Sequence, residues 1–164
     1  NGDEDTTASL APQPSLADVD SAVAHSADAG IATKLVVNGQ RRELAPGIEL
    51  AAFRIVQEAL TNVLKHAGQR ASATVTISYA SDAVTIEIND DGRGAVSSLT
   101  NAGGGNGLIG MRERVEIYGG ELSAGPRTGG GYTVRAVLPT DDTEGRPSVA
   151  STTTSPSQSR DPNK

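Results

Sequence analysis

Residues 53–67 read FRIVQEALTNVLKHA, and this stretch carries two different stripes of side chains. Apolar residues recur at steps of three and four, which predicts an amphipathic helix over residues 48–67 that ends at Gly68. The apolar stripe is Ala52, Val56, Ala59, Leu60, Val63 and Ala67. Because such a stripe must be buried, we expect this helix to lie on a β-sheet.

A second, polar stripe on the same helix consists of Glu58, Asn62, Lys65 and His66. A solvated face is the ordinary explanation of such a stripe. Asparagine is nevertheless a poor helix former, because its side chain competes for backbone hydrogen bonds. One asparagine oxygen with a nearby glutamate suits Mg²⁺, which takes oxygen ligands and is usually shared with substrate phosphates. Lys65 and His66, one turn further on, can reach such phosphates.

The composition limits the classes of protein. The chain has 164 residues, no cysteine and a net charge of −6. The negative charge argues against a nucleic-acid partner, and the lack of cysteine excludes disulfides and thiolate metal sites. No apolar run approaches the roughly 18 residues of a membrane span. The chain begins at Asn1 rather than Met, so we expect a fragment of a longer protein.

Composition also divides the chain. Residues 1–15 resemble a linker, residues 140–164 resemble a disordered tail, and residues 16–139 are expected to form one domain. Its other predicted helices are 16–29, capped by Ser15, and 108–118; its predicted strands are 31–37, 40–44, 74–79, 84–88, 121–124 and 132–138. The first two strands flank Asn38-Gly39, a strong hairpin signal. Residues 92–106 are expected to form a mobile loop. Helices mixed with antiparallel strands predict an α+β sandwich.

The strand over residues 84–88 leads into Asp90-Asp91-Gly92-Arg93-Gly94. Asp90 can point into a cleft and accept a hydrogen bond from an exocyclic amine such as that of adenine. Glycines at 92 and 94 let a ligand approach the backbone. A plain Asp-Gly turn explains the same residues, whereas a calcium loop is disfavoured because the EF-hand spacing is absent.

Gly105-Asn106-Gly107 leads into the helix that begins with Leu108. Free backbone N–H groups at a helix start attract phosphate. A flexible linker before a capped helix is the alternative explanation. The segment is neither a Walker A loop nor a dinucleotide-binding fingerprint, because it lacks Gly-Lys-Ser/Thr and follows a loop.

Together these segments resemble sensor histidine kinases of two-component systems. Residues 53–67 look like the N box, residues 90–94 like the G1 box, residues 105–114 like the G2 box, and residues 130–139 like the closing strand. The most similar subfamily is the nitrate-sensor type, which signals to response regulators with a LuxR-type DNA-binding domain. The likeness covers roughly residues 16–139.

The resemblance implies the Bergerat ATP-binding fold, a two-layer sandwich of a mixed, mostly antiparallel sheet backed by about three helices. It implies ATP and Mg²⁺ as ligands, and it implies roles for single residues. The implied roles are Asn62 on the metal; Glu58 as catalytic base; Lys65 and His66 near the phosphates; Asp90 on the adenine amine; Gly92 and Gly94 on the adenine wall; Gly105, Gly107 and Leu108 at the lid; and Thr133 beneath the adenine.

The partners implied by the resemblance lie outside this chain. The dimerising hairpin domain with its phosphoacceptor histidine is missing, because His66 belongs to the N box and His25 is followed by Ser26 rather than by an acidic residue. Asn106 also departs from the histidine that the family often has between its G2 glycines. We therefore expect a monomeric cytoplasmic domain of a homodimeric kinase, which does not label itself. Whether the whole protein is a membrane sensor stays open.

The function predicted from the sequence is donation of the γ-phosphoryl group of ATP to a histidine, for relay to a response regulator. An anti-sigma-factor protein-serine kinase and a non-catalytic nucleotide-binding module are the alternatives. A DNA topoisomerase or mismatch-repair ATPase is disfavoured by the acidic charge and the short lid.

Overall fold

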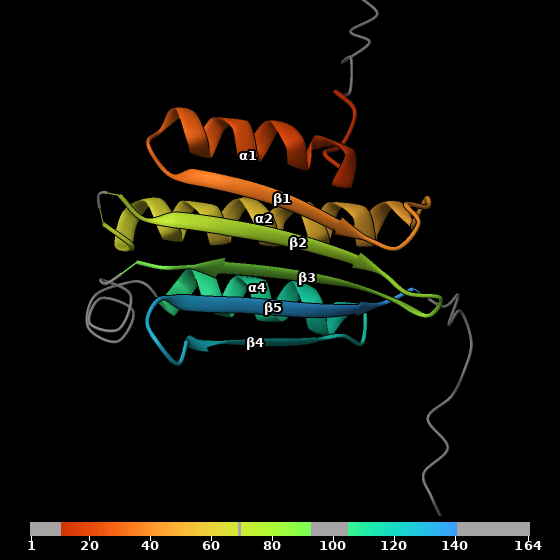
Figure 1. Cartoon of the computed structure of the whole chain (residues 1–164). Helices are drawn as coiled ribbons and strands as arrows, with labels where there is room; N and C mark the ends of the chain where they lie inside the picture. Colours follow the sequence, from red (N-terminus) through yellow and green to blue (C-terminus); the bar gives the residue numbers. More distant parts are fainter. Residues whose placement is uncertain (1–10, 69, 93–104, 141–164) are drawn as a thin grey trace, which may run out of the picture.

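The computed structural model describes residues 11–68, 70–92 and 105–140. It has two layers, a five-stranded sheet and a layer of helices on one of its faces (Figure 1). The elements are a 3₁₀ turn Leu16–Asp18, α1 Val19–Asp28, β1 Ala32–Asn38, α2 Pro46–His66, β2 Ser72–Tyr79, β3 Ala83–Asp90, α4 Gly105–Ile117, β4 Glu121–Pro126 and β5 Tyr132–Pro139.

The strands lie in the order β1-β2-β3-β5-β4. β1 runs parallel to β2, and the other three pairings are antiparallel. The predicted α+β sandwich with a mixed, mostly antiparallel sheet is therefore confirmed, and the described residues contain the expected three α-helices. The linker predicted over residues 1–15 falls mostly outside the described residues, as does nearly all of the tail predicted over residues 140–164.

The predicted N-cap at Ser15 is present and fixes the start of the helical layer. The backbone N–H of Ala17 donates to Ser15 Oγ at 3.2 Å, and the N–H of Ser15 donates to Asp18 Oδ2 at 2.8 Å. This reciprocal arrangement satisfies donors that a helix start leaves without partners. The chain then passes through α1, which packs on β1 and α2.

The hairpin predicted around Asn38-Gly39 is wrong. Gly39 does have a positive φ of 78°, but residues 40–45 form no strand, and β1 pairs in parallel with β2 instead. Residues 40–43 are all exposed and carry no apolar side chain that could be buried in a sheet. Leu35 and Val37 of β1, in contrast, face the helices beside buried residues of β2.

The core lies between the sheet and α2, where the apolar stripe predicted from the sequence is buried. Alternate residues of β2, β3 and β5 point into it from the sheet, as expected for a sheet with one covered face. The helix begins at Pro46, two residues before the predicted start, because proline is accepted in the first turn of a helix.

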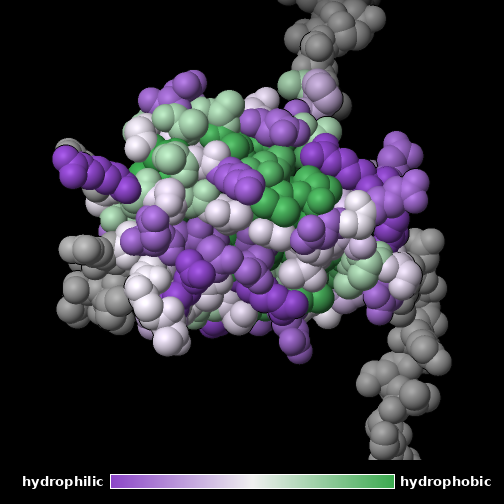
Figure 2. All heavy atoms as spheres, in the orientation of Figure 1, coloured by the Kyte–Doolittle hydropathy of each residue, from purple (hydrophilic) through white to green (hydrophobic). Residues whose placement is uncertain are grey.

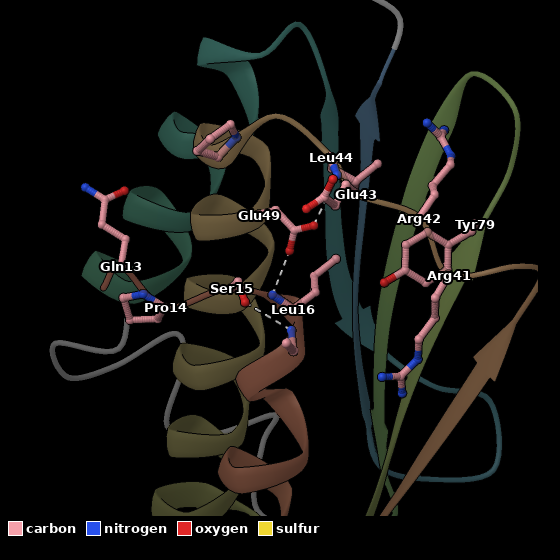
Figure 3. A pocket seen from close by; sticks show the side chains of 12 residues that line it. Gln13, Pro14, Ser15, Leu16, Arg41, Arg42, Glu43, Leu44, Glu49 and Tyr79 are labelled. Carbon is pink, nitrogen blue, oxygen red and sulfur yellow. Dashed lines mark hydrogen bonds between the residues drawn. The ribbon is translucent and has the colours of Figure 1, made fainter. Parts of the chain in front are cut away.

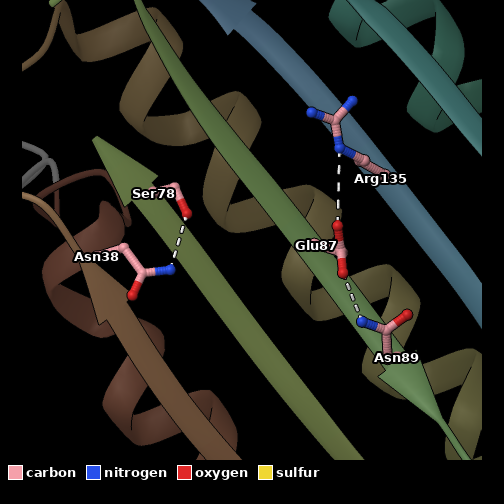
Figure 4. A network of polar contacts seen from close by, with 5 residues as sticks. All are labelled: Asn38, Ser78, Glu87, Asn89 and Arg135. Atoms are coloured by element: carbon pink, nitrogen blue, oxygen red, sulfur yellow. Dashed lines mark hydrogen bonds and ion pairs between the residues drawn. The ribbon is translucent and has the colours of Figure 1, made fainter. Parts of the chain in front are cut away.

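Within the described residues no helix covers the opposite face of the sheet. Figure 2 shows hydrophilic colours over much of this face, beside a hydrophobic patch toward the upper right. Glu87 and Arg135 form an ion pair at 3.7 Å across β3 and β5, and Asn89 Nδ2 donates to Glu87 Oε1 at 2.6 Å (Figure 4). Because residues two apart in a strand share a face, these side chains show which positions of β5 point away from the helices.

Candidate functional site

Four elements meet at one end of the sheet, around a small cavity between the C-terminal half of α2 and the paired strands β3 and β5. The first turn of α4 closes it. The lining residues are Ala59, Asn62, Val63, His66, Ala67, Ile88, Asp90, Leu108, Tyr132 and Val134. The cavity thus brings together the N-box, G1 and G2 segments that the sequence set far apart.

The cavity has a volume of about 20 Å³, which is room for roughly one water molecule. In this conformation it is therefore too small for an adenine ring. Leu108 is the lining residue that the first turn of α4 contributes. The contacts of that turn show what holds it there.

Those contacts are made to the polar stripe of α2. Gly107 lies so close to Glu58 that a side-chain carbon on it would overlap Glu58 Oε1, and the same position is 3.6 Å from Asn62 Nδ2. A residue with a side chain could not approach in this way without displacing Glu58. Gly107 therefore places the start of α4 directly against two of the predicted site residues.

Asp90 is the charged side chain at the floor of the cavity, and only 6% of it is exposed. Its Oδ1 accepts a hydrogen bond from the N–H of Gly92 at 2.8 Å, and the N–H of Tyr132 also bonds to the carboxylate. Burial raises the pKa of Asp90, while these hydrogen bonds act in the opposite direction. The carboxylate is thus desolvated but held by the backbone, which suits an acceptor for a ligand's N–H.

The neighbouring Asp91 has a structural position instead. Its side chain accepts hydrogen bonds from the N–H of Ser72 at 2.6 Å and from the Ser72 hydroxyl at 2.5 Å. These bonds, the hydroxyl first, hold the pKa of Asp91 below its usual range. They fix the start of β2 to the end of β3 and so keep Asp90 in place.

Two glycines permit the close packing around Asp90. A side-chain carbon on Gly92 would lie 2.5 Å from Ala67 Cα and 2.7 Å from Ala67 O at the end of α2. Gly131 has a φ of 85°, and a side-chain carbon there would lie 2.7 Å from the carbonyl carbon of Asp90. Both positions therefore require glycine.

The remaining predicted residues lie in different places. His66 lines the cavity, and Lys65 is exposed beside it on α2. Gly105 is the first residue of α4, three residues earlier than the predicted helix start. Gly94, and most of the loop predicted over residues 92–106, lie outside the described residues.

Thr133 is not among the cavity residues, whereas Tyr132 is. Thr133 shares its face of β5 with the exposed Arg135, while Tyr132 shares its face with the buried Val134. Thr133 therefore lies on the other face of β5 from the cavity, and its contact with adenine stays a prediction. The sequence analysis did not name Tyr132. The signal was present in the sequence, because a charged residue two positions after Thr133 marks the outward face.

A larger hollow of about 510 Å³ lies at the opposite end of the sheet. It separates Tyr79 and Arg41 from Leu16 and Glu49 (Figure 3). Glu49 ties two segments to α2 there, because its Oε2 accepts from the N–H of Leu16 at 2.8 Å and its Oε1 from the N–H of Leu44 at 3.3 Å. None of the predicted site residues that the structure describes lines this hollow.

The donors around the small cavity fit a shared cation better than a dedicated metal cage. Within residues 11–68, 70–92 and 105–140, no three His, Cys, Asp or Glu side chains gather into a metal site. Asn62 and Glu58, one turn apart on α2, offer hard oxygen ligands of the kind that Mg²⁺ takes when substrate phosphates complete its coordination.

Among the residues that the structure describes, no helix is long and apolar enough to cross a membrane.

Comparison with known proteins agrees with this geometry. The profile of the family described as "Histidine kinase-, DNA gyrase B-, and HSP90-like ATPase" matches residues 47–142, more than half of the chain. The chain belongs to this ATPase family. The match contains α2, β3 and α4, so it contains the cavity residues. Membership confirms the family that the sequence motifs indicated, and it confirms ATP as the nucleotide of that family. The nitrate-sensor subtype stays a prediction.

Curated relatives of this ATPase domain are bacterial sensor kinases. Sensor histidine kinase LnrJ of Bacillus subtilis (strain 168) is 31% identical over 109 residues, which cover 66% of this chain and 26% of the relative. The histidine-protein kinase/phosphatase DegS of the same organism is 33% identical over 100 residues, with 60% and 26% covered. The chain thus spans about a quarter of the length of the curated relatives it matches.

Solved structures share the fold. The blue-light activated histidine kinase of Erythrobacter litoralis EL346 has a TM-score of 0.62 and 24% identity, covering 79% of this chain and 43% of that protein. A nucleotide-free catalytic domain of histidine kinase ThkA has a TM-score of 0.57 and 13% identity, covering 75% of this chain and 92% of that domain. The ATPase domain described here therefore corresponds in fold to an isolated kinase catalytic domain.

Proposed function

We propose that this chain is the ATP-binding catalytic domain of a sensor histidine kinase. It binds Mg-ATP at the cavity between α2, β3, β5 and α4, and it donates the γ-phosphoryl group to a histidine on a separate dimerisation and phosphoacceptor domain. The phosphoryl group then passes to an aspartate of a response regulator, which we expect to carry a LuxR-type output domain. The whole kinase acts as a homodimer. This domain alone is a monomer and does not bind nucleic acid.

The single observation that carries the proposal is the convergence of three distant segments. Asn62, Asp90 and Leu108 line one cavity, and Gly107 lies against Glu58. A structural explanation of the same residues accounts for each contact separately, but it gives no reason for a buried carboxylate and a mid-helix asparagine to face the same space.

We assign to each residue a part that its position supports. The Asp90 carboxylate accepts a hydrogen bond from the exocyclic amine of adenine. The side-chain oxygen of Asn62 holds Mg²⁺, which would supply charge neutralisation for the transferring phosphoryl group. Lys65 adds positive charge near the phosphates, His66 lies beside it, and the start of α4 offers N–H groups to them. The imidazole nitrogen of the acceptor histidine forms a bond to the γ-phosphorus, the bond from that phosphorus to the β,γ-bridging oxygen breaks, and ADP leaves. Glu58 accepts the imidazole proton.

Opening of the cavity is part of the proposed cycle. Because about 20 Å³ cannot hold adenine, the first turn of α4 leaves Glu58 and Asn62 as nucleotide enters.

The experiment that tests the proposal mixes this chain with the helical hairpin domain of a candidate kinase and radioactive Mg-ATP. We expect acid-labile, base-stable phosphate on the hairpin domain and none on this chain, since it lacks an acceptor. Acid-stable phosphoserine on an added antagonist protein would support the anti-sigma-factor alternative. Nucleotide binding without any transfer would support a non-catalytic module.

A further inference from the structure

We propose that Tyr132, rather than Thr133, supplies the wall of the adenine subsite from the closing strand, and that its backbone N–H orients the acceptor carboxylate of Asp90. This inference rests on the proposed function, because it assigns a new contact within the same site. It makes Tyr132 a residue that determines affinity for the base.

The pairing of β3 with β5 puts Tyr132 next to Asp90. Ile88 is the register partner of Val134, and Asn89 is the partner of Thr133. The antiparallel register therefore sets Tyr132 opposite Asp90, where cross-strand side chains lie roughly 5 Å apart. These two residues line the cavity together with the apolar Ile88 and Val134.

The backbone of Tyr132 acts on Asp90 as well. Its N–H bonds to the Asp90 carboxylate, and Arg127 Nη1 donates to the Asp90 carbonyl oxygen at 3.3 Å. Gly131, immediately before Tyr132, packs against the same carbonyl group. The turn that leads into β5 thus holds Asp90 from one side, while Gly92 N–H holds it from the other.

The side chain of Tyr132 is suited to contact a base. It is half-buried and packs against the core, and burial raises the pKa of its hydroxyl. The phenol is therefore neutral at physiological pH and presents an apolar ring. Contact between an aromatic ring and a base contributes about 1–3 kcal/mol per base when measured by alanine substitution.

Thr133 provides a matched control on the adjacent position. Its side chain lies on the outward face of β5 with Arg135, so its substitution leaves the cavity unchanged. Tyr132→Phe keeps the ring, Tyr132→Leu keeps an apolar residue without the ring, and Thr133→Val changes only the outward face. Leucine is chosen in place of alanine because it keeps β5 packed, and denaturation curves verify that each variant folds.

The test is calorimetric titration of the full 164-residue chain and its variants with Mg-ATP. We expect Tyr132→Leu to weaken binding by at least about 5-fold, corresponding to the lower end of base–aromatic contacts. Thr133→Val is expected to bind like the original chain, and Tyr132→Phe, which keeps the ring, is expected to bind more tightly than Tyr132→Leu.

Two results would overturn this inference. Equal or tighter binding by Tyr132→Leu would show that the ring does not contact the base. Loss of binding by Thr133→Val would show that Thr133 makes the contact with adenine from β5. If the unaltered chain binds no Mg-ATP while folded, the proposed function itself fails, and this inference fails with it. The two failures are therefore distinguished by the unaltered chain.

Discussion

Gly92 gives the sharpest test of the packing that holds the cavity together. In Gly92→Ala the new methyl group would lie 2.5 Å from Ala67 Cα and 2.7 Å from Ala67 O. Both are atoms of the backbone at the end of α2, so they cannot rotate away as a flexible side chain would. The variant must separate β3 from α2 locally or leave the methyl group overlapped.

The expected cost follows from this overlap. Forcing one methyl group into a well-packed site costs about 1–3 kcal/mol of folding free energy. Gly110→Ala is the matched control, since its methyl group meets only Arg114 Nη1 at 3.6 Å, an ordinary contact. Because Gly110 lies inside α4, alanine there should stabilise the protein by about 0.5–1 kcal/mol.

The assay is urea unfolding of both variants and the unaltered chain, with circular dichroism as the signal that monitors unfolding. We expect the midpoint to fall for Gly92→Ala and to rise for Gly110→Ala. If the midpoint of Gly92→Ala does not fall, the close contact of Gly92 with Ala67 is not present in solution, and the reasoning about the adenine wall fails.

Three further predictions concern the site. Asp90→Asn should weaken Mg-ATP binding by about 1–3 kcal/mol, because a buried charged hydrogen bond is lost. An unchanged dissociation constant, measured by calorimetry, would show that Asp90 does not bind the adenine base. Asn62→Ala should make ATP affinity insensitive to Mg²⁺, measured with and without EDTA, while Asn89→Ala on the outer face keeps that sensitivity. If Asn62→Ala also keeps it, Asn62 is not the ligand. Asp91→Asn should lower the free energy of unfolding at pH 7, because the hydrogen-bonded carboxylate stabilises the fold only while it is ionised. The difference in unfolding free energy between the variant and the unaltered chain should shrink as pH falls below the usual pKa of 3.8 and through the lowered pKa of Asp91. A difference that is constant from pH 7 to pH 2 would contradict this.

The sequence was sufficient for the parts of the fold that local patterns encode. The two stripes of α2 are visible as helical periods in residues 53–67, and Asn62 and His66 do line the cavity. The Ser15 cap was equally readable, since a capping residue and its partner lie three positions apart. These features depend on residues that are neighbours in the chain.

Tertiary context decided what the sequence did not reveal. Asn38-Gly39 is a local hairpin signal, but β1 pairs with β2, whose residues lie 40 positions later in the register. The overlap between Gly92 and Ala67 depends on how α2 crosses the sheet, which no local pattern encodes. The closed cavity likewise depends on α4 packing against Glu58.

The most direct test of the central claim is to titrate the isotopically labelled chain with Mg-ATP and follow backbone amide signals by NMR. The account predicts that the largest shifts occur together at Asn62, Asp90 and Tyr132, with smaller effects at Glu49 and Tyr79 around the larger hollow. Shifts concentrated at Glu49 and Tyr79, or none at all at millimolar ATP, would contradict it.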